Sequence, residues 1–320
     1  MNKELLSSIF NEIKENKRIT IFPHARPDGD CIGSSFGLKD IIETTWPDKT
    51  VIVAGESSSF TKILGEPTVP TDEEIKGSLG ICLDTANKDR LADQRYGLCE
   101  KVIKIDHHIN VEDYGDINYV DTSRPAAALI ILDLFMENKD VLTMTKEGAK
   151  ALFFGILTDT GRFKYSGVNG DTFRNVAVLY DYGLESREVY AYLDTKTEES
   201  ARFQGFLLQN WQKTENGVAF FKILPEHLEK FNVTLEEAAS YVNEMGKFSD
   251  YPVWILFAEY EEQIVRARMR SKGPAINMLA NKYDGGGHAM ACGANLGTWE
   301  RSDLLLKDAD QLVKEYKEEK

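Results

Sequence analysis

The sequence predicts an α/β protein of two domains, with a doubly wound, mostly parallel sheet in the first and a smaller α/β arrangement in the second. The chain has 320 residues, which exceeds the usual size of one domain. Short apolar runs alternate with helical segments through the first half, a pattern typical of parallel sheets. The polar stretch 190–200 then interrupts this pattern. We therefore expect domains at 1–190 and 213–320, with a linker and helix at 191–212.

The apolar runs of the first half are short enough for buried strands, and the segments between them have helical spacing. The strands are expected at residues 19–22, 51–53, 80–83 and 101–105, and the helices at 38–44, 126–136 and 148–157. The second half mixes both types. Its strands are expected at 217–224, 253–260 and 263–270, and its helices at 201–211, 234–245, 275–282 and 301–314.

Composition excludes several classes of protein. The net charge of −14 argues against a protein that coats long nucleic acids, although it leaves room for short phosphorylated substrates. The four cysteines are scattered, as in reduced intracellular proteins. The N-terminal residues 1–17 form an amphipathic pattern and lack the apolar stretch of a signal peptide, and no run reaches transmembrane length. A cytoplasmic protein without a membrane partner is expected.

Polar side chains follow three of the predicted strands, at the point where each strand ends. His24, Asp28 and Asp30 follow the first strand, Asp84 follows the third, and Asp106-His107-His108 follows the fourth. Asp159 similarly ends a helical apolar run. Ligands of open parallel sheets bind beyond the carboxyl ends of the strands. These groups are therefore expected to converge at one edge.

Each of these positions also has a simpler explanation. An aspartate such as Asp28 commonly caps a helix, and a strand-end aspartate such as Asp84 is common in plain loops. One of the two adjacent histidines could be a buried structural residue. Taken together, however, the carboxylates and imidazoles form a ligand set that suits Mn²⁺ or Mg²⁺ better than structural Zn²⁺. They suffice for two metals, which can activate a water and stabilise the leaving oxygen of a phosphoryl transfer.

The second half carries two signals for phosphate binding. In a strand over 263–270, Arg266, Arg268 and Arg270 would share one face, and guanidinium groups pair with phosphate. A solvated face balanced by Glu259, Glu261 and Glu262 explains the same pattern. Further on, the glycines 285–287 precede His288 and would let the backbone approach a ligand closely, whereas a flexible surface loop is the alternative.

In this order and at these separations, the motifs resemble the DHH phosphoesterase superfamily, and most closely its nanoRNase and pAp-phosphatase branch. The resemblance covers nearly the whole chain. Its motifs are HxxPDGDxxGS at 24–34, the strand-end Asp84, the triplet 106–108, TDTGRF at 158–163, and Arg270-Ser271 followed by GGGH at 285–288.

The resemblance implies a DHH domain, a DHH-associated C-terminal domain, and an active site in the cleft between them. It implies two divalent ions, Mn²⁺ by preference with Mg²⁺ or Co²⁺ as substitutes. One ion would be held by His24, Asp28 and Asp84, and the other by Asp30, Asp84, His107 and Asp159. Asp84, His108 and Asp106 would be catalytic, with His108 beside the scissile phosphate and Asp106 orienting the histidines. The implied substrate-binding residues are Arg268, Arg270, Ser271, Gly285, Gly286, Gly287 and His288. The sequence departs from the family pattern at Arg268, Asp284 and Cys292.

The implied activity is hydrolysis of very short oligoribonucleotides to 5′-mononucleotides, together with removal of the 3′-phosphate of 3′-phosphoadenosine 5′-phosphate (pAp). Short RNA and nucleotide bisphosphates are thus the expected partners, and a homodimer is compatible with the sequence. A phosphodiesterase for cyclic or linear di-AMP is the alternative activity. A non-catalytic nucleotide sensor is a further alternative, although no predicted metal ligand is missing.

Overall fold

The computed structural model describes residues 2–55, 57–58, 60–165, 167–260 and 264–319. The chain forms two compact units, Met1–Asp194 and Thr195–Lys320. Glu261, Glu262 and the first residue of the expected strand 263–270 lie outside the described residues. None of the described helices combines the length and the apolar composition that crossing a membrane requires.

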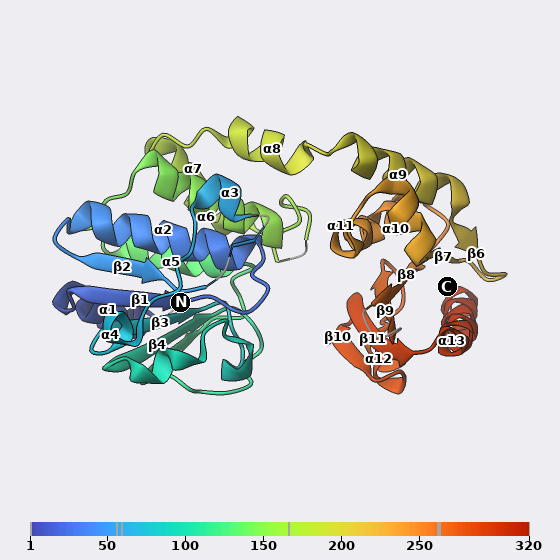
Figure 1. The fold of residues 1–320 in the computed structure, drawn as a ribbon, viewed down its shortest axis with the longest axis horizontal. Helices are drawn as coiled ribbons and strands as arrows, with labels where there is room; N and C mark the ends of the chain where they lie inside the picture. Colours follow the sequence, from blue (N-terminus) through green and yellow to red (C-terminus); the bar gives the residue numbers. More distant parts are fainter. Residues whose placement is uncertain (1, 56, 59, 166, 261–263, 320) are drawn as a thin grey trace. The chain divides into compact units, whose positions relative to one another are not determined.

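The N-terminal unit contains a five-stranded sheet in which every pairing is parallel (Figure 1). This result confirms the predicted fold class and the four predicted strands. The strand order is β2 (Thr50–Val53), β1 (Arg18–Phe22), β3 (Leu79–Leu83), β4 (Lys101–Asp106) and β5 (Ile117–Val120). The short β5 was not predicted, because its sequence INYV is only four residues long and half-exposed.

Long helices cover one face of this sheet, and short segments cover the other. The first face packs against α1 (Lys3–Glu15), α2 (Gly29–Thr45), α5 (Ala127–Glu137) and α6 (Lys146–Asp159) in the main apolar core. The second face packs against a smaller cluster that includes Leu91, Tyr96 and Tyr114. The remaining elements are α3 (Thr61–Leu64), α4 (Asp72–Ile75), η1 (Lys88–Arg90), η2 (Gln94–Leu98), α7 (Gly170–Asp181) and α8 (Ser186–Asp194).

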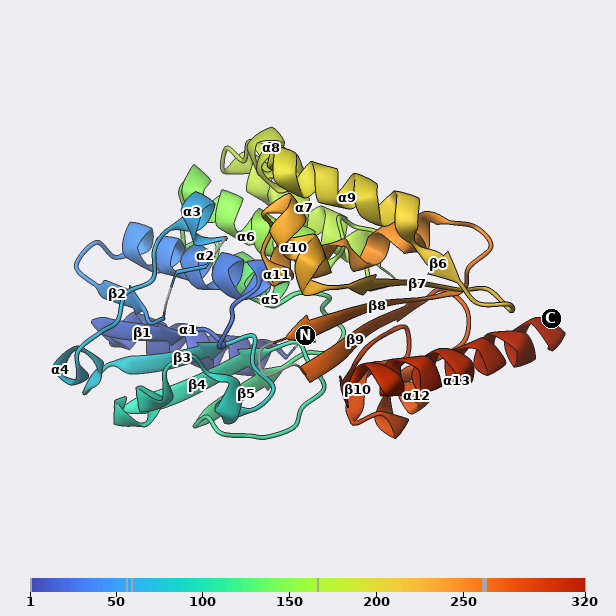
Figure 2. The same ribbon diagram turned by 45° about the vertical axis from the view of Figure 1, so that its right-hand side comes forward.

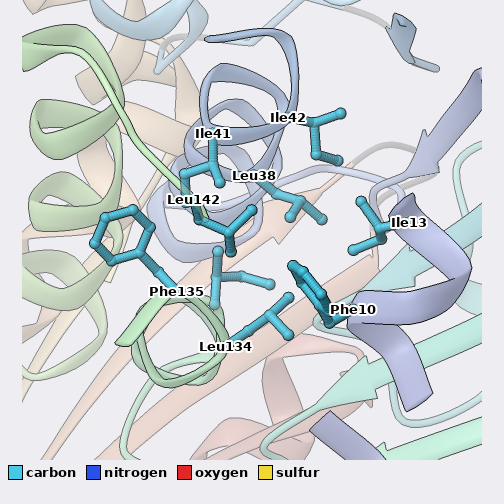
Figure 3. A pocket seen from close by; sticks show the side chains of 9 residues that line it. Phe10, Ile13, Leu38, Ile41, Ile42, Leu134, Phe135 and Leu142 are labelled. Carbon is cyan, nitrogen blue, oxygen red and sulfur yellow. The ribbon is translucent and has the colours of Figure 1, made fainter. Parts of the chain in front are cut away.

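Apolar side chains from α1, α2 and α5 meet around a small gap in the main core (Figure 3). Phe10 comes from α1, Leu38 and Ile41 come from α2, and Phe135 comes from α5. This gap is apolar throughout, so it serves packing and offers no polar group to a ligand.

Glycines on α2 allow α6 to approach it very closely. A Cβ atom at Gly29 would lie 2.5 Å from the Thr158 hydroxyl, and one at Gly33 would lie 2.5 Å from the Ala151 carbonyl oxygen. Real Cβ atoms essentially never come so close to another atom. The glycines of the HxxPDGDxxGS motif therefore set the distance between the two helices. This distance matters for the site, because Asp30 belongs to α2 and Asp159 ends α6.

The C-terminal unit contains a six-stranded mixed sheet in the order β10-β11-β9-β8-β7-β6. Only β7 and β8 are parallel. One sheet face packs on α12 and α13 and the other packs on α9, α10, α11 and η3 (Figure 2). The elements are α9 (Glu198–Asn210), β6 (Gln212–Lys213), β7 (Val218–Ile223), α10 (Pro225–Phe231), α11 (Leu235–Ser240), η3 (Tyr241–Lys247), β8 (Val253–Tyr260), β9 (Ile264–Ser271), α12 (Asn277–Lys282), β10 (Gly285–His288), β11 (Ala291–Gly297) and α13 (Trp299–Glu318).

The boundary between the two units falls after Asp194, within the expected linker 190–200. Much of this stretch is helical, because α8 continues to Asp194 and α9 begins at Glu198. The polar side chains there are the helix-start signals of α9, where Thr197 accepts a hydrogen bond from the Ser200 backbone N–H. The glycine run 285–287 is not a flexible loop. It forms strand β10, which pairs antiparallel with β11.

We predict that Gly33→Ala destabilises the N-terminal unit. The new methyl group would force α2 and α6 apart, and overpacking of this kind typically costs about 1–3 kcal/mol. Urea unfolding of the full chain would measure the loss. The matched control is Gly97→Ala, because a Cβ atom at Gly97 would meet no atom within 4 Å. Equal unfolding midpoints for the two variants would contradict the close approach of the helices.

Candidate metal centre

The predicted metal-binding side chains of the N-terminal unit lie together at the carboxyl edge of its sheet. His24 follows β1, Asp84 follows β3, and His107 follows β4. Asp28 is the N-cap of α2, and Asp159 is the last residue of α6. Residues far apart in the sequence therefore converge, as the parallel topology predicts.

Asp84 lies at the middle of this cluster. Its Oδ2 atom is 3.6 Å from His24 Nε2, and its Oδ1 atom is 3.3 Å from His107 Nε2. The residue is 2% exposed, yet its Oδ1 atom accepts no hydrogen bond from any described residue. Its backbone is left-handed, with φ of 58°, a conformation that Asp tolerates better than most residues. A buried oxygen without a hydrogen bond, flanked by imidazoles on both sides, fits a bridging metal ligand.

The two flanking histidines are oriented in the same way. His24 places Nδ1 3.0 Å from the Ala25 carbonyl oxygen, and His107 places Nδ1 3.2 Å from the Arg124 carbonyl oxygen. A donated Nδ1–H bond to a carbonyl fixes the tautomer in which Nε2 carries the lone pair. In both residues Nε2 faces carboxylates. His107 Nε2 lies 3.4 Å from Asp159 and 3.9 Å from Asp30.

Two of the aspartates also bind helix N-termini. Asp28 Oδ1 accepts hydrogen bonds from the backbone N–H groups of Asp30 and Cys31, while its Oδ2 atom lies 3.8 Å from His24 Nε2. The helix-cap explanation and the ligand explanation are thus compatible, because each uses a different oxygen. Asp30 accepts from the N–H groups of Ala127 and Ala128 at the start of α5. Helix N-termini stabilise these two negative charges.

Crowding of the carboxylates changes the proton affinity of the whole cluster. Burial, together with the charges of Asp84 and Asp28, raises the pKa of Asp159 to about 6, against the opposing charge of His107. Burial and the charges of Asp84 and Asp159 likewise raise the pKa of Asp30. Burial alone would lower the pKa of His107, but the close Asp84 carboxylate and the other surrounding carboxylates raise it to about 10. Without a cation, bound protons balance the negative charge.

The donor set fits divalent cations. A metal about 2.0–2.2 Å from each ligand leaves two of its ligands roughly 3–4 Å apart, and the carboxylate-to-imidazole separations given above fall in this range. Oxygen and imidazole donors suit hard or borderline ions such as Mn²⁺. Cys31 also lies close to His24 and Asp84. Burial raises the pKa of its thiol to about 12, so it remains a protonated and therefore poor ligand.

His108 differs from its neighbour His107. Its Nδ1 atom lies 2.8 Å from Asp106 Oδ1 and 3.5 Å from Asp84 Oδ1. Of the two histidines, both among the described residues, only His108 makes a hydrogen bond to Asp106. The expectation that Asp106 orients both histidines is therefore narrowed to His108. Lys104, a buried lysine on β4, lies 3.8 Å from the other Asp106 oxygen and donates to the Ala86 and Glu112 carbonyls. It thereby ties two loops to the strand.

The residues that support His107 from behind were not predicted from the sequence. The carbonyl that accepts from His107 belongs to Arg124, whose guanidinium makes two hydrogen bonds to Asp133, of 2.7 and 2.9 Å. Asn175 donates to the same carboxylate. Asp133 is 4% exposed within an otherwise apolar helix. A charged residue in the apolar run 126–136 was the available signal.

The predicted substrate-binding residues of the C-terminal unit lie on β9, β10 and β11. Arg268 donates to the Ala239 carbonyl and to the Tyr260 hydroxyl. The Ser271 hydroxyl donates to the Pro274 carbonyl and accepts from the Gly273 N–H, so both of its hydrogen-bonding roles are already used within a turn. Arg270 donates to the Met269 carbonyl oxygen.

The three predicted glycines differ from one another. A Cβ atom at Gly285 would lie 2.1 Å from the Gly293 carbonyl oxygen, and one at Gly287 would lie 2.6 Å from the Ala291 carbonyl oxygen. These two glycines are required by strand pairing. At Gly286, in contrast, the nearest atom is 3.8 Å away, so this position is open to a ligand. His288 is exposed at the end of β10.

The family of the chain follows from this fold and this cluster. The model of the DHH family, N-terminal domain, matches residues 18–156, and the model of the DHHA1 domain matches residues 216–315. The chain belongs to the DHH family, which confirms the resemblance drawn from its motifs.

Individual relatives span nearly the whole chain. The bifunctional oligoribonuclease and PAP phosphatase NrnA of Bacillus subtilis is 38% identical over 93% of this chain and 95% of its own length. A probable protein of the same name from Streptococcus mutans is 35% identical, with 96% and 98% covered. Among solved structures, an exopolyphosphatase-related protein from Bacteroides fragilis has a TM-score of 0.87 and 24% identity over 98% of both chains, a similarity of fold.

We predict that metal binding releases protons and weakens at low pH. His107, with a pKa of about 10, is protonated at neutral pH and must lose its proton to bind a metal. Asp159, with a pKa of about 6, gains a proton as the pH falls through 6. Calorimetric titration with Mn²⁺ in buffers of different ionisation enthalpy should show net proton release at pH 7. The affinity should fall between pH 8 and pH 6.

The control for this titration is His227→Asn. His227 belongs to the C-terminal unit and stacks on Phe221, so its removal should leave proton release unchanged. An Mn²⁺ affinity that stays constant from pH 8 to pH 6 would contradict the assignment of His107 and Asp159 to the centre.

Proposed function

We propose that the chain is a metal-dependent phosphoesterase that hydrolyses very short oligoribonucleotides to 5′-mononucleotides and removes the 3′-phosphate of pAp. The observation that carries the proposal is the Asp84 carboxylate, which lies between two Nε2 atoms with one buried oxygen lacking a hydrogen bond. The substrate class is supported by relatives of 35–38% identity whose names state both activities.

The proposed ligand sets share Asp84. His24, Asp28 and Asp84 would hold one cation, and Asp30, Asp84, His107 and Asp159 would hold the other, with Mn²⁺ as the preferred ion. Two such cations lower the pKa of a water and attract the phosphate oxygens and the leaving oxygen. The protein keeps this centre rigid, since Asp28 and Asp30 are each fixed by two backbone N–H groups.

His108 is proposed to contact the scissile phosphate. Asp106 holds its Nδ1 atom, which leaves Nε2 for a hydrogen bond to a phosphate oxygen or for proton transfer to the leaving oxygen. Asp106 is buried and accepts from both the backbone N–H and the side chain of His108. The hydrogen bonds to the carboxylate lower the pKa of Asp106 despite its burial, so it stays ionised and keeps the imidazole in position.

The C-terminal unit is proposed to bind the substrate phosphate through Arg268, Arg270 and His288. Guanidinium groups bind phosphate in a bidentate manner, and the open Gly286 lets the ligand approach the sheet. Ser271 contributes indirectly, because its hydroxyl shapes the turn that follows Arg270. Gly285 and Gly287 keep β10 close to β11.

A substrate panel tests the proposal. We expect turnover of a labelled RNA dinucleotide and of pAp in Mn²⁺, with higher kcat/KM values than for cyclic di-AMP, linear pApA or pyrophosphate. Dominant hydrolysis of cyclic di-AMP or pApA would favour the di-AMP phosphodiesterase instead. Tight nucleotide binding without any product, at every metal concentration, would indicate a sensor.

We predict that Asp84→Asn abolishes turnover while the chain stays folded. Asparagine tolerates left-handed backbone as aspartate does, so the change removes the charge without strain, which alanine would add. Loss of a shared ligand should lower kcat more than about 100-fold, since changes outside the ligand shell already cost about 10- to 100-fold. The matched control is Asp89→Asn, an exposed aspartate of the same unit. Near-normal activity of Asp84→Asn with full metal content would contradict the bridging role.

A further inference from the structure

We propose that Tyr260 and Arg266 form a stacking platform for the second nucleotide of a dinucleotide substrate. The inference rests on the proposed function, because it assigns part of the same substrate. It adds a subsite that separates dinucleotides from pAp, which has a single base. The platform follows from the register of β8, β9 and β11, from the open glycine positions beside the arginines, and from the contacts of Tyr260.

The register of β8, β9 and β11 places the three arginines in one row on one sheet face. Arg266, Arg268 and Arg270 lie opposite Asn295, Gly293 and Ala291 of β11, respectively. Alternate residues along a strand share a face, so their Cα atoms are about 6.8 Å apart. His288 lies opposite Ala291 and so shares the line of Arg270. The row therefore begins at the residues proposed to bind phosphate and runs away from them.

The floor beside this row has almost no side chains. Gly286 pairs with Gly293, which in turn pairs with Arg268. Both glycines are exposed, and a Cβ atom at either would meet nothing closer than 3.6 Å. Strand pairing does not require glycine at these two positions, in contrast to Gly285 and Gly287. A flat ligand can therefore lie directly on the backbone beside the arginines.

Tyr260 stands at the far end of the row, between two guanidinium groups. Arg266 lies over its ring, 4.7 Å from the centroid, and Arg268 donates to its hydroxyl at 3.4 Å. Arg266 is exposed and Tyr260 is half-buried. Nucleobases stack on aromatic rings and on guanidinium planes alike. The pair therefore presents a preformed flat surface with positive charge.

The alternative, a solvated face balanced by Glu259, Glu261 and Glu262, loses the one of these residues that the structure describes. Glu259 is turned to the opposite face, where it accepts a hydrogen bond from the Trp299 indole of α13. Among the residues that the structure describes, neither Arg266 nor Arg268 has a carboxylate oxygen within 4.0 Å. The helices that cover this face pack mainly on β7 and β8, and they leave Arg266 of β9 and Asn295 of β11 exposed.

The size of the row matches a dinucleotide better than a single nucleotide. From Arg270 to Arg266 the strand advances by roughly 13.6 Å, or four residues. A phosphate held by Arg270 and His288 leaves the remaining length for a sugar and a second base. The single base of pAp would not need the far end of the row. Loss of the platform should thus weaken hydrolysis of dinucleotides and leave hydrolysis of pAp unchanged.

The experiment compares kcat/KM for an RNA dinucleotide and for pAp in Mn²⁺. For Tyr260→Leu we expect the dinucleotide value to fall about 10-fold, mainly through KM, because stacking of one base contributes to binding on this scale. Arg266→Lys keeps the charge but loses the plane, so a fall of several-fold is expected. Tyr260→Phe keeps the ring and should stay within about twofold of wild type. All three variants should hydrolyse pAp within about twofold of wild type, because Arg268 keeps its hydrogen bond to the Ala239 carbonyl when the long contact with the Tyr260 hydroxyl is lost.

A dinucleotide that lacks its second base completes the test as a cycle. Wild type should hydrolyse this compound about 10-fold less well than the normal dinucleotide, and Tyr260→Leu should show no additional loss. Arg202→Lys, an exposed arginine of α9 paired with Glu198, is the matched control and should change neither substrate. The platform would be overturned if Tyr260→Leu lowered kcat/KM equally for pAp and the dinucleotide. It would also be overturned if Tyr260→Leu lowered kcat/KM as much for the dinucleotide without its second base as for the normal one.

The failure of this inference is distinguishable from failure of the proposed function. The proposed function fails if wild type hydrolyses neither compound. Binding of a dinucleotide with a non-hydrolysable methylene linkage then tests the platform directly: weaker binding by Tyr260→Leu than by wild type supports it, and equal binding overturns it. An unchanged urea unfolding midpoint would show that Tyr260→Leu is folded.

Discussion

Repulsion among carboxylates at the edge of the parallel sheet is the constraint on which the N-terminal unit depends. Asp28, Asp30, Asp84 and Asp159 lie around two imidazoles, and burial raises the cost of each charge. Two of the four receive help from helix N-termini: α2 donates to Asp28 and α5 donates to Asp30. Asp84 receives no such donor at its Oδ1 atom. The charge that the fold leaves uncompensated therefore concentrates where a shared cation would bind.

The same constraint explains why glycines on α2 matter so far from any ligand atom. Asp30 and Asp159 can surround His107 only if α2 and α6 almost touch, and Gly29 and Gly33 permit that approach. Gly155 on α6 acts from the other side, since a Cβ atom there would lie 2.8 Å from Asp30 Oδ1. Small residues in the motif thus set the geometry of the centre, whereas the aspartates and histidines supply its chemistry.

Much of this arrangement could be predicted from the sequence, for a physical reason. A polar residue at the end of a buried apolar strand lies at the carboxyl edge of a parallel sheet, so the positions of Asp84 and Asp106 could be predicted directly. Support from outside the motifs could not be found in this way. The Arg124–Asp133 pair, which fixes the carbonyl behind His107, joins a turn to a helix and leaves only one charged residue in an apolar run. The sequence also left open whether the glycine run is a flexible loop, because glycine favours loops locally, while its pairing with β11 is a long-range effect.

The two units gather charges of opposite sign within one acidic chain. A net charge of −14 repels phosphates, so any phosphate-binding surface must create local positive potential. The N-terminal unit gathers excess carboxylates, and a divalent cation would relieve their mutual repulsion. The C-terminal unit instead aligns three arginines on β9 next to a floor without side chains, and it turns Glu259 to the other face. Under the proposed function, both the cations and the guanidinium groups would act on phosphate groups.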